Sequence, residues 1–453
     1  MLVDKNRIKK INKAELKKND FVAYWMQSSQ RLEYNQALGY AVERANQLNQ
    51  PLLVFFLLNA NYPEAEYRHF KFMLQGLKEV KKKLKAEKIN FYIIDYKKLE
   101  DLEKITKRAS LVVSEKVYLK QLRKWKDRAA QRLSNPFYLV ESNLVCPIEE
   151  VSDKEEYAAY TIRKKINKVR DRYLKKYQRE KLQNKEKIQL DKSEIDIIED
   201  LDLYLAEMKP EKYDEQQSYF KGGYKEAKLK LNDFLKNKLK DYDQKRNIPH
   251  LNFQSDLSPY LHFGQISAQE AALEALNSEY DSEDFLEELI VRRELAFNFV
   301  YYNQNYDKSL EDILYDWAYQ TLMEHKNDKR EYLYNYDQLE NYKTHDKYWN
   351  AAQKEMVITG KMHNYMRMYW GKKILEWTAD PEEAFQWALR LNNKYSLDGR
   401  DANSYAGVGW IFSKHDRAWK EREIFGKVRY MNANGLERKF DMDKYLKKIS
   451  DLE

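Results

Sequence analysis

Short apolar runs alternate with amphipathic segments along the first third of the chain. The pattern predicts strands at residues 21–26, 52–58, 91–96, 111–114 and 137–145, and helices at residues 31–49, 67–85 and 116–132. Short apolar strands that alternate with helices are typical of a parallel α/β sheet. The connecting turns carry neither a GxGxxG nor a GxxxxGK[ST] fingerprint, so nothing here supports dinucleotide or P-loop chemistry.

The pattern changes after the last predicted strand. Residues 149–179 are charged and mostly helical in period, and residues 181–199 combine Lys, Asp and Glu with few large apolar side chains. From residue 224 to about residue 430 nearly everything has helical periodicity. We therefore expect four parts. They are a polar arm (1–20), an α/β domain (21–180), an interdomain linker (181–218) and an all-helical domain (219–453).

Composition indicates a class of partner and a cellular compartment. The 453 residues include 36 Tyr and 9 Trp, which can supply a large core, and a net charge of +8, which suits a polyanionic partner if it gathers on one face. Cys146 is the only cysteine, so no intrachain disulfide can form, and the seven histidines show no zinc spacing. The longest apolar run, residues 51–58, is too short to span a bilayer. We expect a cytoplasmic, monomeric protein without a metal site or a membrane segment.

Two stretches carry candidate chemistry. Trp349 and Trp377 lie on either side of the segment GKMHNYMRMYW, which ends at Trp370 and is helical in period from residue 361. Trp370 and Trp377 share one helix face. Read alone, they indicate a buried core. In the second stretch, Ser258 as N-cap and Pro259 at the first helical position predict a helix start. Free amide groups at such a start bind phosphate.

The first of these stretches resembles the flavin-enclosing helix of the photolyase/cryptochrome superfamily. Further segments are similar to its class II cyclobutane pyrimidine dimer (CPD) photolyases, and these begin at residues 31, 68, 257, 287, 344, 397 and 423. Together the matches extend from about residue 20 to residue 441. The resemblance implies a Rossmann-like N-terminal α/β antenna domain and a C-terminal all-helical domain that binds FAD.

The resemblance also implies a set of cofactor-binding residues. An ion pair of Arg367 and Asp398 is expected beside the flavin ring, and Asn392 is expected near flavin N5. The loop departs from the commoner Gly-Arg-Asp-Pro-Asn-Gly-Tyr, since Ala402 and Ser404 replace its Pro and second Gly. The remaining expected FAD contacts are Tyr224, Ser255, Leu257, Ser258, Arg293, Asn364 and Asp401.

The resemblance also implies electron-transfer residues and substrate-binding residues. Trp349, Trp370 and Trp377 match the class II electron-transfer tryptophans, and Tyr334 and Tyr369 are expected as accessory donors. One glutamate among Glu287, Glu288 and Glu294 should face the lesion, and Glu288 matches best. The expected contacts to the lesion are Met368 and Trp410, and those to DNA phosphates are Arg417, Lys427 and Arg429.

The implied activity is a light-driven lyase reaction on UV-damaged duplex or single-stranded DNA. Photoexcited reduced FAD would transfer an electron to a flipped-out pyrimidine dimer. An antenna chromophore such as a deazaflavin is a candidate for the N-terminal domain by analogy with relatives. Two alternatives stay open: a cryptochrome-like blue-light photoreceptor without repair activity, and a (6-4) photoproduct lyase, which needs a histidine pair that the sequence does not reveal.

Overall fold

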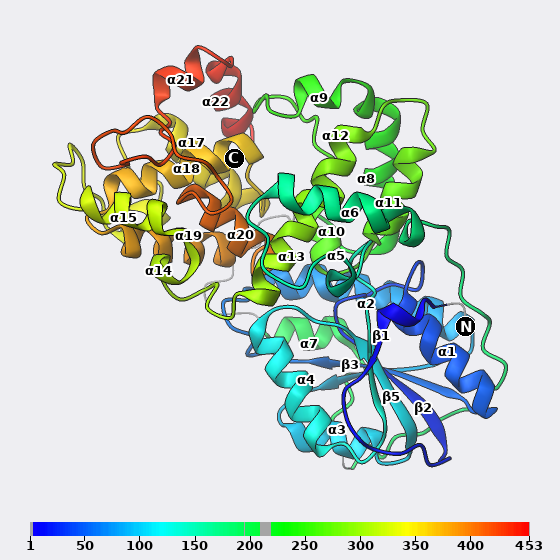
Figure 1. Cartoon of the computed structure of the whole chain (residues 1–453). Helices are drawn as coiled ribbons and strands as arrows, with labels where there is room; N and C mark the ends of the chain where they lie inside the picture. The colour runs from blue at the N-terminus through cyan, green and yellow to red at the C-terminus, as the bar shows by residue number, and fades with distance from the viewer. Residues whose placement is uncertain (1–2, 194, 209–218, 453) are drawn as a thin grey trace.

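The computed structural model of the chain describes residues 3–193, 195–208 and 219–452. Figure 1 shows a sheet-containing part, coloured blue and cyan, packed against a larger helical part that runs from green to red. This arrangement confirms the predicted fold class, α/β followed by all-α. Within the described residues, no helix is both long and apolar enough to cross a membrane.

The sheet has six strands in the order β1-β6-β5-β2-β3-β4, and all neighbours are parallel except β1 and β6. Every residue of β2, β3 and β5 is buried, because helices cover both faces of a parallel sheet. The strands are β1 (Ile8–Lys10), β2 (Phe21–Met26), β3 (Leu52–Leu58), β4 (Asn90–Asp95), β5 (Ala109–Glu115) and β6 (Phe137–Val140). The helices of this part are α1 (Gln36–Leu48), α2 (Tyr67–Ala86), α3 (Leu99–Thr106), α4 (Lys120–Arg132) and α7 (Leu201–Glu207), preceded by the 3-10 turn η1 (Lys5–Arg7).

The helical part surrounds an aromatic core that contains all three tryptophans of the central segment. Its helices are α5 (Ile148–Val151), α6 (Ala159–Tyr173), α8 (Tyr224–Asn237), α9 (Tyr242–Lys245), α10 (Ser258–His262), α11 (Ala268–Leu276), α12 (Glu283–Leu286), α13 (Arg293–Tyr302), α14 (Leu310–Ile313), α15 (Asp316–Glu324), α16 (Tyr336–Glu340), α17 (Lys347–Thr359), α18 (Asn364–Trp377), α19 (Pro381–Tyr395), α20 (Ala402–Ile411), α21 (Ala433–Glu437) and α22 (Met442–Ser450). Two irregular turns complete the set, the 3-10 turn η2 (Leu239–Asp241) and the π-helical η3 (Glu287–Arg292).

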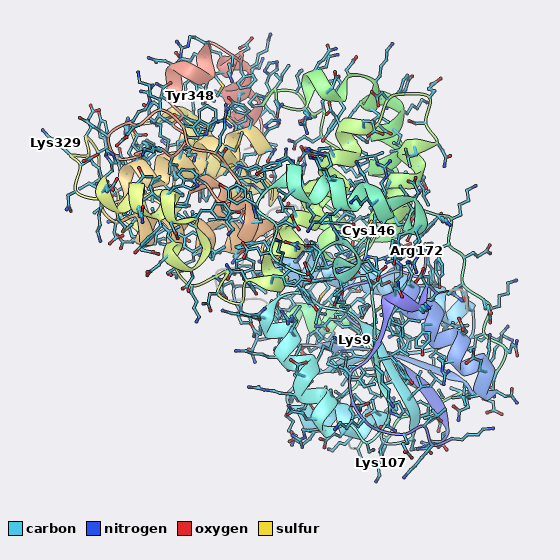
Figure 2. The ribbon with its side chains drawn as sticks, in the orientation of Figure 1. Lys9, Lys107, Cys146, Arg172, Lys329 and Tyr348 are labelled. Atoms are coloured by element: carbon cyan, nitrogen blue, oxygen red, sulfur yellow. The ribbon has the colours of Figure 1, made fainter. Side chains whose placement is uncertain are left out.

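The division of the chain differs from the expected one. Residues 3–20 are not a free arm, because β1 extends the sheet and Arg172 of α6 pairs with Asp4 at 3.0 Å. Helix α6, expected in the α/β domain, buries Ile162 and Ile166 in the core of the helical part. Cys146 is buried in the same core, close to where the two parts meet (Figure 2).

The expected linker also packs on the sheet domain. Ile188, Ile195 and Ile198 are buried among its side chains, and Ile197 forms a bridge with Ile94. Isolated isoleucines in a charged stretch give no periodic signal, so the pattern of the sequence did not reveal this packing. Residues 194 and 209–218 of the expected linker lie outside the described residues.

Two helical segments differ from the expected pattern for local reasons. The helix expected from residue 361 begins at Asn364, because α17 ends at Gly360 in the left-handed region (φ 76°). A Cβ atom at Gly360 would approach Cγ of Leu397 to 2.8 Å, so both space and backbone favour glycine there. In the stretch expected to be helical from residue 224 to about residue 430, residues 287–292 form the π-helical turn η3 between α12 and α13, a feature frequent at functional sites.

A buried arginine joins the two parts of the molecule. The Arg31 guanidinium donates to the carbonyls of Gly264 (2.9 Å), Ser142 (2.6 Å) and Tyr34 (3.0 Å), and its Nε donates to Glu33 (3.0 Å). Burial lowers the pKa of Arg31 to about 10, which keeps it charged at neutral pH. At the same junction Gly264 has φ 64°, and a Cβ atom there would overlap the Ser28 carbonyl.

Arg31→Lys should therefore destabilise the protein. A lysine cannot donate to four carbonyls in this geometry, and each buried carbonyl left unpaired costs about 1–3 kcal/mol. We expect the free energy of unfolding in urea to fall by roughly 2–4 kcal/mol. Arg132→Lys is the control, since Arg132 forms only half-exposed ion pairs with Glu100 and Glu103. An equal effect of the two substitutions would contradict this role of Arg31.

Candidate functional site

An open cavity in the helical part gathers most of the expected cofactor-binding residues. It lies between the segment before α10, the η3 turn, the start of α18 and the loop between α19 and α20. Among the residues expected from the sequence, its walls contain Ser255, Leu257, Ser258, Glu288, Arg293, Asn364, Arg367, Asp398 and Asp401. These four separate segments of the chain therefore converge on one cavity.

An ion pair lies at the wall of this cavity. Nη2 of Arg367 is 3.6 Å from Oδ1 of Asp398, as the resemblance implies. Within the described part of the chain, Nε of Arg367 and Oδ1 of Asp398 are buried and have no hydrogen-bond partner. Such atoms are rare in folded proteins unless a ligand or water completes them. This wall is therefore suited to a polar group that enters the cavity.

The start of α10 differs by one residue from the expected start. Leu257 is the N-cap, Ser258 is the first helical residue, and Pro259 follows. Beside this start, Lys361 forms an ion pair with Asp256, which has φ 56°. Burial alone would raise the pKa of Asp256, but the charge and hydrogen bond of Lys361 lower it below its usual value. The carboxylate thus fixes a lysine at the cavity wall.

The structure separates the three candidate glutamates. Glu288 lines the cavity and accepts a hydrogen bond from Nη1 of Arg246 at 2.7 Å. Glu287 instead pairs with Arg163 (2.7 Å) and Arg292 (3.0 Å). Glu294 is fully buried, and its Oε1 accepts from the backbone N–H of Cys146 at 3.0 Å. Consecutive residues of a helical turn do not share a face, so the neighbours Glu287 and Glu288 meet different partners.

Two expected residues do not line the cavity. The Tyr224 hydroxyl donates to Oε1 of Glu270 at 2.6 Å, and its ring lies under Nζ of Lys83 at 4.1 Å. Asn392 is buried in α19, where its Oδ1 accepts from Oγ of Ser396 at 3.3 Å. Nδ2 of Asn392 has no partner among the described residues, so its amide is available to a neighbouring group.

The three tryptophans form a row. The rings of Trp349 and Trp370 are nearly parallel, with centroids 6.5 Å apart and an interplanar angle of 8°. Trp349 and Trp377 meet edge to face at 5.7 Å. Trp370 lies one turn beyond Arg367 on α18, so the order from the cavity outward is Trp370, Trp349, Trp377. All three are buried, and Nε1 of Trp370 donates to Gln353 at 2.9 Å.

The expected lesion contacts and DNA contacts are all at least partly exposed. Met368 and Trp410 are half-buried, and the guanidinium of Arg292 lies 5.0 Å from the Trp410 ring. Trp419, 38% exposed, lies between the guanidinium groups of Arg417 (5.0 Å) and Arg429 (5.2 Å). The exposed Lys427 accepts through its carbonyl from the N–H of Trp419 at 2.8 Å. The result is a compact basic and aromatic surface.

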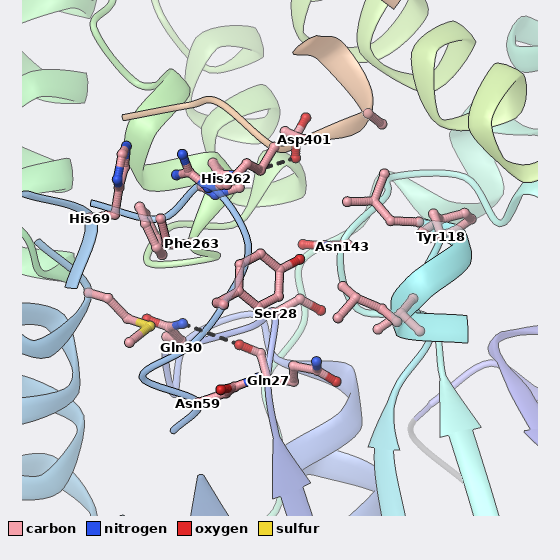
Figure 3. Close-up of a pocket in the computed structure, with 18 of the residues that line it drawn as sticks. Gln27, Ser28, Gln30, Asn59, His69, Tyr118, Asn143, His262, Phe263 and Asp401 are labelled. Atoms are coloured by element: carbon pink, nitrogen blue, oxygen red, sulfur yellow. Dashed lines mark hydrogen bonds and ion pairs between the residues drawn. The ribbon is translucent and has the colours of Figure 1, made fainter. Parts of the chain in front are cut away.

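A second cavity lies between the sheet domain and the helical part (Figure 3). Its polar wall includes Gln27, Gln30, Asn59 and Asn143, and its aromatic wall includes Phe263. His262 and Asp401 line both cavities, and Nδ1 of His262 is 3.3 Å from Oδ2 of Asp401. Burial opposes ionisation of Asp401, but the hydrogen bond and charge of His262 lower its pKa below the usual value.

Sequence reasoning missed part of the first cavity. Asp256 and Lys361 border the recognised segments, so their neighbours gave a usable signal. Tyr242, Arg246 and Asn247 lie in a short irregular stretch around α9 that matched no segment. Only the fold places these three residues at the cavity.

The described structure therefore has two parts and two cavities. A polar cavity lined by cations lies in the helical part, and a cavity lined by aromatic and amide side chains lies at the junction of the two parts. Residues 22–185 match the family model described as DNA photolyase. The chain is 45% identical over 453 residues to the deoxyribodipyrimidine photo-lyase of Methanothermobacter thermautotrophicus, with 100% of this chain and 99% of that protein covered.

Solved structures agree on the fold. A bacterial class III photolyase from Agrobacterium tumefaciens superimposes with a TM-score of 0.77 at 18% identity, covering 97% of this chain and 88% of that one. An archaeal photolyase from Sulfolobus tokodaii, described with two FAD molecules, gives 0.70 at 19% identity, covering 94% and 89%. The chain belongs to the DNA photolyase family.

The burial of Glu294 predicts a pH dependence of stability. Burial raises the pKa of Glu294 to about 8, so the folded state binds a proton that the unfolded state releases near pH 4.5. The free energy of unfolding should therefore fall as pH rises from about 5 to 8, by up to roughly 1.4 kcal/mol per pH unit.

Glu294→Gln should remove most of this dependence, as measured by urea unfolding at several pH values. Glu287→Gln is the control. Burial would raise the pKa of Glu287, but Arg163 and Arg292 hold it below the usual value, so that carboxylate does not titrate in this interval. Parallel pH curves for the wild type and Glu294→Gln would contradict the assignment.

Proposed function

We propose that this protein is a light-driven DNA photolyase that uses reduced FAD to split cyclobutane pyrimidine dimers. The observation that carries the proposal is the cavity, whose walls combine most of the expected FAD contacts with Glu288. The 45% identity to a deoxyribodipyrimidine photo-lyase over the whole chain supports the same activity. The class II segments of the sequence favour a monomeric, cytoplasmic enzyme of that class, acting on UV-damaged duplex or single-stranded DNA.

The donor set of the cavity fits FAD. The backbone amides at the starts of α10 and α18, with the cations of Arg293 and Lys361, suit a pyrophosphate. The unpartnered polar atoms of Arg367, Asp398 and Asn392 suit the edge of a ring with several heteroatoms. Ser255, Leu257, Ser258 and Asn364 would hold the phosphates, Arg367, Asp398 and Asn392 would face the ring, and Asp401 would complete the wall. When bound, reduced FAD supplies a light-absorbing one-electron donor.

The chain provides position and electrostatics for that chemistry. Arg367 places a fixed positive charge where negative charge must be accommodated, and Asp398 orients the guanidinium. Glu288 presents a carboxyl group that can hydrogen-bond a pyrimidine edge, and Arg246 orients it. A damaged base pair unstacks at low cost, and Met368 and Trp410 offer apolar surfaces against which a flipped-out dimer can stack.

The tryptophan row serves reduction of the cofactor rather than repair itself. Indole is the most easily oxidised common side chain, and the row Trp370, Trp349, Trp377 has ring centroids 5.7–6.5 Å apart. An electron can therefore pass inward from the outer indole to the cavity in short steps. The hydrogen bond from Trp370 to Gln353 fixes the inner indole.

The surface formed by Arg417, Trp419, Lys427 and Arg429 is proposed to contact DNA phosphates. Two guanidinium groups flank one exposed indole, so cations and a stacking surface lie together. The second cavity, with its mixture of aromatic and amide side chains, is proposed to hold an antenna chromophore. A deazaflavin remains the candidate.

The decisive experiment is illumination of the FAD-loaded, reduced protein with an oligonucleotide that contains a thymine dimer. We expect recovery of intact thymines, measured by chromatography. Glu288→Gln should lower the repair yield by roughly tenfold, because one hydrogen bond to a charged group contributes about 1.5 kcal/mol. Glu283→Gln, an exposed neighbour on α12, should match the wild type. Absence of repair in the wild type would favour the photoreceptor alternative.

Trp370→Phe tests the electron path separately. A phenyl ring is much harder to oxidise than indole, so photoreduction of the bound oxidised cofactor should slow strongly, while chemically pre-reduced protein should still repair dimers. Trp387→Phe, at a half-buried tryptophan beside Tyr336, is the matched control. Photoreduction at the wild-type rate in Trp370→Phe would exclude Trp370 from the path. Both rates are followed by the flavin absorbance.

A further inference from the structure

The end of α15 supports the loop that carries the proposed DNA surface. This loop, residues 417–429, contacts the helix at Thr321, whose Oγ1 accepts from the N–H of Lys427 at 3.0 Å. Beside it Gly426 has φ 52°, and a Cβ atom there would overlap Thr321 and approach Cδ2 of His325 to 2.9 Å. Glycine therefore allows the loop to lie directly on the helix end.

His325, the residue that caps the C-terminus of α15, has a carboxylate at each ring nitrogen. Its Nδ1 is 2.6 Å from Oδ2 of Asp328, and its Nε2 is 3.2 Å from Oε1 of Glu421 in the loop. An ionised carboxylate only accepts hydrogen bonds, so both contacts are made only when both ring nitrogens carry hydrogen. The arrangement therefore favours the imidazolium form, which the negative end of the helix dipole also favours.

Asp328 joins the helix end to the loop at a second point. The Oδ2 atom that meets His325 also accepts from the N–H of Ile424 at 2.7 Å. Ile424 has φ 67°, a conformation that is strained for a β-branched residue and persists only where its neighbours fix it. The bond to Asp328 fixes it within a tight turn, in which Arg422 and Gly426 exchange backbone hydrogen bonds of 3.0 and 2.7 Å.

The surface proposed to contact DNA is built on this turn. The N–H of Trp419 donates to the carbonyl of Lys427 at 2.8 Å, so the exposed indole is attached across the turn. Phe425 and Val428 anchor the inner side of the loop in the core of the helical part. The orientation of the indole and of the guanidinium groups around it therefore depends on how the turn is fixed against α15.

The charged groups near the imidazole come from three elements. They are Lys326, Asp328 and Arg330 after α15, Glu421 of the loop, and Asp380 at the start of α19. Lys326 pairs with Asp380 at 2.7 Å. The hydrogen bond to Asp328 raises the pKa of His325 above its ordinary value; burial opposes this shift and Glu421 adds to it. The two contacts are therefore complete at low pH and are lost as pH rises through this raised pKa.

We propose that His325 is a positioning residue for DNA binding; this rests on the DNA surface proposed above. As an imidazolium it joins Asp328 at the helix end to Glu421 of the loop, and so orients Trp419 and its flanking guanidinium groups toward a phosphate backbone. When the imidazole releases its proton to solvent, one ring nitrogen can no longer donate, and its contact with a carboxylate is lost. The loop must then be ordered on binding, which weakens the affinity for DNA.

The test is binding of the FAD-loaded protein, in the dark, to an oligonucleotide that contains a thymine dimer and a pH-insensitive dye. Fluorescence anisotropy would be followed from about pH 6 to pH 9 at constant ionic strength. We expect the wild-type Kd to rise by roughly fivefold, as the partly exposed ion pairs of His325 are lost. His325→Gln should have the weaker Kd at every pH. His345→Gln, at an exposed histidine stacked on Tyr332 at 3.7 Å, is the matched control and should keep the wild-type profile.

Glu421→Gln tests the same contact from the side of the loop. The Glu421 side chain is 53% exposed, so the substitution should leave the fold intact. It should flatten the pH profile, and the double variant with His325→Gln should lose no more affinity than either single variant. Salt dependence at the acid end of the range separates positioning from direct contact. The slope of log Kd against log salt should be the same in the wild type and His325→Gln, since a positioning residue neutralises no phosphate.

Parallel pH profiles of the wild type and His325→Gln would overturn the proposal. A salt slope smaller by about one in His325→Gln would also overturn it, because that change indicates a direct phosphate contact. With saturating DNA, illuminated and reduced His325→Gln should repair dimers with the wild-type yield, and a lower yield would contradict a role confined to binding. Repair by the wild type combined with a flat wild-type pH profile would refute this inference alone. Absence of both dimer binding and repair in the wild type would refute the proposed function as well.

Discussion

The turn at Gly360 is the constraint on which both the cavity and the tryptophan row depend. It ends α17 with a left-handed residue, and the Gly360 carbonyl accepts from the N–H of Leu397 at 2.8 Å. That bond ties the loop before α20 to the start of α18, so Asp398 meets Arg367. The same reversal brings α17 back along α18 and stacks Trp349 on Trp370. One close backbone contact therefore aligns the polar wall and the aromatic row.

The parts of the fold that could be predicted are those with a strong local pattern. Strand β3 and helix α2 were predicted closely, because an uninterrupted apolar run and a regular amphipathic period are strong local signals. Strand β1 was missed because three residues with two exposed lysines show no alternation. The contribution of Ile188 and Ile195 to the sheet domain was missed because their partners are distant in the sequence.

The candidate site also contains residues that could be predicted from the sequence and residues that could not. Arg367 and Asp398 could be predicted as a pair only through a resemblance, since 31 positions separate them and each looks ordinary alone. The choice among the three glutamates depends on their partners, Arg246, Arg163 and the backbone N–H of Cys146, which are distant in the sequence. Tyr224 illustrates the opposite limit. It was expected to contact FAD only through the resemblance, whereas its hydroxyl donates to Glu270 and its ring lies under Nζ of Lys83.

Charged side chains lie around the polar cavity and at the outer end of the tryptophan row. The cations Arg293, Lys361 and Arg367 surround the polar cavity, where the incomplete hydrogen bonding of Arg367 and Asp398 has a free-energy cost of about 1–3 kcal/mol per buried group. A bound group that completes these contacts recovers that cost, so ligand binding and folding stability are coupled. Toward the surface, Nζ of Lys373 lies 5.6 Å from the centre of the Trp377 ring, so this cation disfavours positive charge on the outer indole of the tryptophan row.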